Sequence, residues 1–167
     1  NFEPWHGLDR LIDSINAYSG PVTIRLHLIG NRPNKTELKS TKHTIICHGP
    51  IYDNKKINKI ISTCNIAISV LCLFRKQMTE ACALKSREYI VKGIPFIYAY
   101  NDTDINENYS FCLRLVNDSS IIDFKEIINF LIQLSVKLPE IKETSHNFAK
   151  QKLSLESKLS QLVKLTI

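Results

Sequence analysis

The chain has 167 residues, of which 44% are hydrophobic, and a formal net charge of +6. At this length folding buries about 70% of the surface that the unfolded chain exposes, so we expect one globular domain and exclude a disordered chain. The longest apolar stretches, such as residues 66–74, are far shorter than the roughly 20 residues of a membrane-spanning helix.

The first half of the chain alternates helical and strand-like segments. Apolar residues at helical spacing predict a helix over 8–15. Two β-branched, apolar runs predict strands over 22–29 and 43–47, each of which ends at a turn that contains glycine. A second helix is expected over 52–63. The continuous apolar run at 66–71 is typical of a strand that is buried on both faces.

The second half continues the alternation. A helix is expected over 84–91, followed by strands over 94–99 and 112–116 and by a long helix over 121–136. The polar tail carries apolar residues at helical spacing, which predicts an amphipathic helix over 144–165.

This order of elements indicates the fold class α/β, with a three-layer, Rossmann-like domain around a mainly parallel sheet. We expect the domain to cover 1–139 and the amphipathic helix of the same domain to cover 140–167. Four apolar side chains of that helix need a surface to cover them, and their burial stabilises by about 6–10 kcal/mol. They are Phe148, Leu155, Leu159 and Leu162.

The stretch from Thr79 to Pro95 holds the candidate site. Glu80 and Glu88 are separated by seven residues, and a helix is predicted to begin near Ala83. A helix that begins at the carboxyl end of a strand offers free N–H groups and partial positive charge to a phosphate. Each carboxylate can accept two hydrogen bonds from a vicinal diol. The alternative interpretation is a pair of solvated glutamates that stabilise the helix dipole.

The same stretch resembles a known motif. Glu80-Ala-Cys-Ala-Leu-Lys-Ser-Arg-Glu88-Tyr-Ile-Val-Lys-Gly-Ile-Pro95 is similar to the E-x7-E segment of group-1 retaining GT-B glycosyltransferases. Residues 5–11 resemble the start of that family's first helix, residues 26–30 its following strand, and residues 48–51 its strand-end turn beside the base. The resemblance covers about residues 2–116 and implies the C-terminal, donor-binding half of a GT-B fold.

The resemblance implies roles for the acidic stretch. Glu88 would bind the ribose hydroxyls of the donor, and Glu80, with Ala81 and Cys82, would bind the transferred sugar. In many relatives Gly-Phe-Gly follows the first glutamate, whereas this chain has Ala81-Cys82-Ala83. Small residues preserve access here, although the close backbone approach that glycine permits is lost.

The resemblance also implies how the rest of the nucleotide is held. Lys85 would neutralise the diphosphate, with Arg75 and His6 beside it, and Gly49 and Ile51 would flank the base. Many relatives carry a basic pair before and at the start of the first helix. That pair is absent here, because its second position falls at His6. The alternative interpretation of Lys85 is an ordinary exposed lysine, although its place in the first turn of a helix opposes the dipole and favours a phosphate partner. A plain turn is an equally good local explanation of residues 48–51.

The implied reaction is glycosyl transfer from a nucleotide-diphosphate sugar with retention at the anomeric carbon, as in polysaccharide biosynthesis. A missing N-terminal domain of the same polypeptide would bind the acceptor, so this fragment would transfer nothing alone. The scheme requires no cofactor and no metal. We expect a cytoplasmic protein, because five cysteines, an odd number without C-x-x-C spacing, suit a reducing compartment better than a disulfide framework. The parent enzyme would be able to associate with the membrane surface.

A non-catalytic α/β module, either regulatory or associated with nucleic acid, is the alternative interpretation. The positive charge would then serve a phosphate-bearing partner. The charge is spread along the chain without a dense basic run among aromatic residues, so we expect no nucleic-acid partner. Residues 101–104 predict a turn, and no His, Asp or Glu cluster has the spacing of a metal site.

Overall fold

The computed structural model describes residues 2–31, 38–39, 41–105 and 109–165. In the last helix it leaves the side chains of residues 161, 162, 164 and 165 undescribed. Leu162 of the predicted apolar stripe therefore lies outside the described side chains.

All the described strand pairs are parallel, as the alternation of strands and helices predicts. β1 (Arg25–Leu28) pairs with β2 (Thr44–Cys47). β3 (Ala67–Ile68), β5 (Phe96–Tyr98) and β7 (Cys112–Arg114) form a sheet in the order β3-β5-β7. A further short pair, which the pattern did not predict, joins β4 (Glu80–Ala81) to β6 (Asn101–Asp102).

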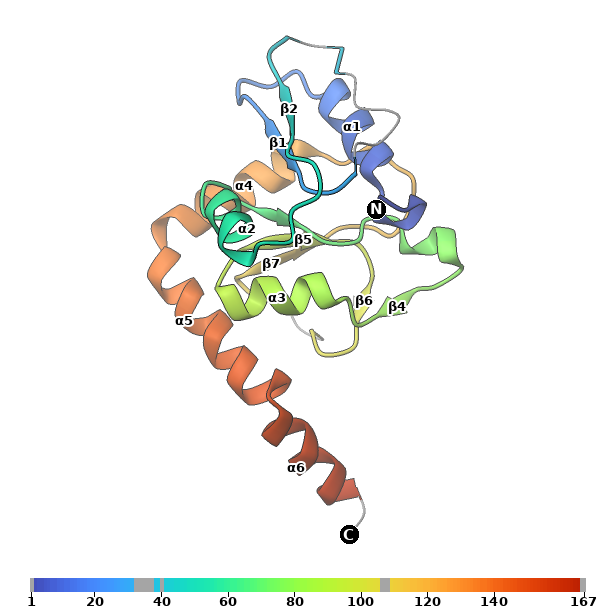
Figure 1. Cartoon of the computed structure of the whole chain (residues 1–167). Coiled ribbons are helices and arrows are strands. Elements are labelled where there is room, and N and C mark those ends of the chain that lie inside the picture. The colour runs from blue at the N-terminus through green and yellow to red at the C-terminus, as the bar shows by residue number, and fades with distance from the viewer. Residues whose placement is uncertain (1, 32–37, 40, 106–108, 166–167) are drawn as a thin grey trace.

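Helices cover both faces of this arrangement (Figure 1). The α-helices are α1 (Leu8–Ala17), α2 (Asn54–Ile61), α3 (Leu84–Lys92), α4 (Phe124–Val136), α5 (Leu138–Phe148) and α6 (Leu155–Leu165). The shorter turns are the 3-10 helices η1 (Pro4–His6) and η2 (Leu73–Lys76) and the π-helical turn η3 (Ala149–Leu153).

Two hydrophobic clusters lie on opposite sides of β5. Ile97 packs in a cluster with side chains of α1 and α4, such as Leu11 and Ile127. Phe96 packs in the other cluster with side chains of α3 and α5, such as Ile90. Because successive side chains of a strand point to opposite faces, this division sets one helix layer on each face of the sheet and confirms the three-layer α/β class.

The C-terminal tail differs from the predicted single helix over 144–165. A helix already begins at Leu138, because Pro139 in the first turn lacks only an N–H group that a helix start leaves unpaired. The chain then leaves the helix at Ser154, whose backbone is extended, and α6 follows. α6 projects away from the strands (Figure 1).

The predicted apolar stripe is consequently divided between two environments. Phe148 is only 5% exposed and packs its ring against Tyr109 and Phe111, with ring centroids 4.8 and 5.4 Å away. Leu155 and Leu159 of α6 are 74% and 51% exposed. The domain thus covers the first member of the stripe itself and leaves these two in solvent.

None of the helices in the described part of the chain combines the length and apolar character needed to cross a membrane.

Candidate functional site

The start of α3, where the site was predicted, lies at the carboxyl end of β4. Ala83 is the N-cap residue and supplies no side-chain hydrogen bond. The backbone N–H groups of the first turn are therefore open to a ligand, and the helix dipole places partial positive charge there. Glu80 and Ala81 belong to β4 and not to a loop, so the strand pair with β6 fixes the backbone that leads into the helix.

Two basic side chains meet near this helix start. Lys85 is partly buried, and burial lowers the pKa of its ammonium group. Burial and the positive charge of Lys85 together lower the pKa of His6 to about 4, so His6 is neutral at physiological pH. In the described structure, no hydrogen bond or ion pair joins the ammonium of Lys85 to another residue.

The backbone around His6 is held firmly against the end of β3. The N–H groups of Leu71 and Cys72 donate to the carbonyl oxygens of His6 and Trp5, at 3.3 and 3.1 Å. Gly7 has a φ of +73° and lies so close to Leu71 and Cys72 that an added Cβ would approach their side chains to 2.8 Å. Only glycine combines that conformation with that contact.

The imidazole of His6 has a defined role for each nitrogen. Its Nδ1 accepts a hydrogen bond from the backbone N–H of Glu3 at 3.1 Å. A neutral imidazole that accepts at one nitrogen carries its proton on the other. His6 therefore offers an Nε2–H donor beside the Lys85 charge.

Arg75, the third predicted diphosphate residue, is engaged elsewhere. Its guanidinium donates to Asp9 Oδ1 and to the carbonyl oxygen of Pro4, both at 2.8 Å. The hydrogen bond from Arg75 lowers the pKa of the Asp9 carboxyl group. Arg75 thus ties η2 to α1 and η1, and its charge is already compensated.

Glu88, the second of the two predicted carboxylates of the site, lies one turn into α3. It is half-exposed and forms an ion pair with Lys92 at the i,i+4 spacing of a helix. Cys82 is exposed, and its thiol lies 4.0 Å from Asp104 Oδ2. The structure therefore brings Lys85 and His6 together but gives Glu88 a partner that a ribose would have to displace.

The predicted base-proximal turn follows β2. Gly49 has a φ of +71°, and its carbonyl oxygen accepts a hydrogen bond from Gly30 N–H at 2.9 Å. An added Cβ at Gly49 would meet no atom within 4 Å, so the turn faces open space. Beside it the rings of His27 and His48 stack, with Nδ1 and Nε2 3.0 Å apart.

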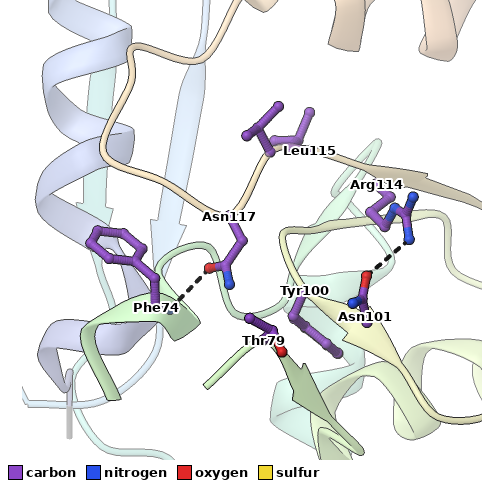
Figure 2. Close-up of a pocket in the computed structure, with 8 residues that line it drawn as sticks. Phe74, Thr79, Tyr100, Asn101, Arg114, Leu115 and Asn117 are labelled. Carbon is purple, nitrogen blue, oxygen red and sulfur yellow. Dashed lines mark hydrogen bonds between the residues drawn. The ribbon is translucent and has the colours of Figure 1, made fainter. Parts of the chain in front are cut away.

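A cavity that sequence reasoning missed adjoins β4. Its volume is about 420 Å³, and Figure 2 shows side chains from η2, the β4 and β6 segments and the end of β7 around it. The lining includes Phe74, Thr79, Tyr100, Asn101, Arg114 and Asn117. The signal in the sequence was the position of Tyr100, Asn101 and Asn117 just beyond the ends of two predicted strands, where α/β sheets bind ligands.

The segment 101–104 is not the plain turn that its composition predicts. Asn101 and Asp102 form β6, and Asp102 pairs with Arg87 of α3, at 2.6 Å between Oδ1 and Nη2. Arg87 also binds Asp104, which accepts a further ion pair from Lys158 of α6. Within the described residues no three His, Cys, Asp or Glu side chains gather as a metal site.

Comparisons with known proteins bear on the fold. No protein-family model and no curated protein matches the sequence. The chain does superpose on the crystal structure of Anabaena Alr3699/HepE in complex with UDP, with a TM-score of 0.61 at 15% identity. The match covers 98% of this chain and 46% of the HepE chain, so this chain spans about half the length of HepE. It has the α/β fold of one half of a GT-B glycosyltransferase.

Proposed function

We propose that this chain is the donor-binding half of a retaining GT-B glycosyltransferase and binds a nucleotide-diphosphate sugar. The observation that carries the proposal is the partly buried, unpaired ammonium of Lys85 beside His6 at the uncapped start of α3. A buried charge without a partner is costly, so it favours an anionic ligand at that place. HepE was crystallised in complex with UDP, which makes uracil the first base to test.

Different residues bind different parts of the donor. The ammonium of Lys85, the Nε2–H of His6 and the first N–H groups of α3 bind the diphosphate. When the bond to the sugar breaks, negative charge grows on the departing diphosphate, and these groups stabilise it where it develops. Arg75 supports the position of His6 through η1 and α1.

The other proposed contacts lie on either side of the diphosphate. Glu80, Ala81 and Cys82 bind the transferred sugar. Glu88 binds the ribose hydroxyls once its ion pair with Lys92 is broken. The turn at Gly49 and Ile51 flanks the base. The scheme uses no metal and no cofactor.

The acceptor belongs to an N-terminal domain of the same polypeptide, so the chain alone binds donor and transfers no sugar. A cytoplasmic enzyme of polysaccharide biosynthesis, able to associate with the membrane surface, fits this proposal. We expect no nucleic-acid affinity that falls steeply with salt, which would be the signature of a nucleic-acid-binding module.

Replacing Glu88 with glutamine should weaken UDP-glucose binding by about 1.5–3 kcal/mol, because the ribose hydroxyls lose a charged acceptor. Replacing Glu80 with glutamine should leave UDP binding nearly unchanged and weaken only the extra affinity that the sugar contributes. Isothermal titration of wild type and both variants with UDP and UDP-glucose measures each contribution.

A control for these titrations is Glu140→Gln, which removes an exposed carboxylate on α5. It should bind both ligands like the wild type. If Glu88→Gln binds UDP with unchanged affinity, Glu88 does not hold the ribose.

A further inference from the structure

The cavity beside β4 has the size and the mixed walls of a saccharide pocket. Pockets for small molecules are typically about 300–1,000 Å³, and this cavity is about 420 Å³. Phe74, Leu115 and Val116 supply apolar surface, while Thr79 and Asn101 supply polar groups. A pyranose ring likewise combines apolar C–H surface with hydroxyl groups.

Arg114 gives the cavity wall a positive charge, and no ion pair within the described residues compensates it. Arg114 is among the lining residues, and none of the lining residues is a carboxylate. Its Nη1 donates to the neutral amide oxygen of Asn101 at 3.2 Å (Figure 2). In the described structure the NH2 group of Asn101 and the hydroxyl of Thr79 make no hydrogen bond. The wall therefore presents a cation and two neutral polar groups to a ligand.

The cavity is continuous with the strand pair that carries the proposed sugar contacts. Thr79 directly precedes Glu80, and Asn101 is the register partner of Glu80 across the β4–β6 pair. The backbone N–H of Asn101 donates to the carbonyl oxygen of Thr79 at 2.8 Å. A sugar held at β4 would therefore have the cavity as its immediate neighbour.

We propose that this cavity receives the transferred sugar and that the sugar is a pyranose bearing a carboxylate, which Arg114 binds. The planar guanidinium matches a carboxylate with two parallel hydrogen bonds, a geometry that a neutral hydroxymethyl group does not offer. This inference rests on the proposed function, since it names the class of sugar that the donor site takes.

Titration with UDP-glucuronate and UDP-glucose tests the inference, because the two ligands differ only in the carboxylate or hydroxymethyl group at C6. We expect the wild-type chain to bind UDP-glucuronate about tenfold or more tightly than UDP-glucose, within the range of a charge-assisted hydrogen-bond pair. Arg114→Gln should abolish that preference, so that the variant binds the two UDP sugars with similar affinity.

The matched control is Arg25→Gln, the same substitution at an exposed arginine that begins β1 and is not among the residues that line the cavity. It should keep the full preference for UDP-glucuronate. Equal affinities of the wild type for the two UDP sugars, or a preference that survives Arg114→Gln, would overturn this inference. Binding of UDP in the same experiment would still support the proposed function. Failure of UDP and of both UDP sugars to bind would overturn the proposed function and the inference together.

Discussion

Replacing Arg10 with methionine should lower the free energy of unfolding by about 3–5 kcal/mol. Arg10 is only 4% exposed and donates to the carbonyl oxygens of Leu71, Val116 and Ser120 at 2.8, 2.9 and 2.7 Å. It also pairs with Asp118 at 3.0 Å. Methionine fills similar space but donates no hydrogen bond, so these acceptors would lose their partner together.

Urea denaturation followed by circular dichroism measures this loss. Arg25→Met removes an exposed arginine and should change the stability by no more than about 0.5 kcal/mol. A loss below about 1 kcal/mol for Arg10→Met would show that water or other donors replace the guanidinium. The substitution should also disturb the cavity, because the loops that Arg10 joins follow β3 and β7 and border it.

Asp102→Asn is the second substitution with a large expected effect, about 3–5 kcal/mol of unfolding free energy. The carboxylate of Asp102 is fully buried, binds Arg87 through both oxygens and accepts the N–H groups of Asp104 and Ile105. Asparagine keeps the shape but removes the negative charge, which leaves Asp104 as the one acidic partner of the Arg87 cation among the described residues.

The same denaturation experiment applies, with Asp13→Asn as a control at an exposed position of α1. Asp13→Asn should stay within about 0.5 kcal/mol of the wild type. A similarly small change for Asp102→Asn would mean that the ion pair and its hydrogen bonds contribute little net stability. Since Arg87 lies in α3, a large loss would also place this network among the features that fix the helix carrying Lys85.

The order of the main elements was predictable because their signal is local. Hydrophobic runs and helical spacing marked most of the helices and strands, and Pro and Gly marked their ends. The strand expected over 66–71 is shorter in the structure, where Ala67–Ile68 is the part that pairs with β5. Its last residues leave the sheet because the N–H groups of Leu71 and Cys72 bind the segment before α1.

The features that the sequence concealed depend on contacts between distant residues. Arg10 and Asp118 are far apart along the chain, and a charged residue in a helix ordinarily indicates a solvated face. The β4–β6 pair joins polar residues of low strand propensity, so no periodic pattern indicated it. Conversely, the position of Lys85 in the first turn of a helix was predictable, because a helix start depends mainly on neighbouring residues.

Titration of the wild type, Lys85→Met and Arg75→Met with UDP-glucose tests the central claim most directly. The claim is that an unpaired lysine at the start of α3 holds the diphosphate. We expect Lys85→Met to weaken binding by about tenfold or more, because a charge-assisted hydrogen bond contributes about 1.5–3 kcal/mol. Arg75→Met should weaken it by no more than about threefold, because Asp9 already compensates Arg75. Equal losses in the two variants, or a Lys85→Met variant that binds like the wild type, would contradict the account.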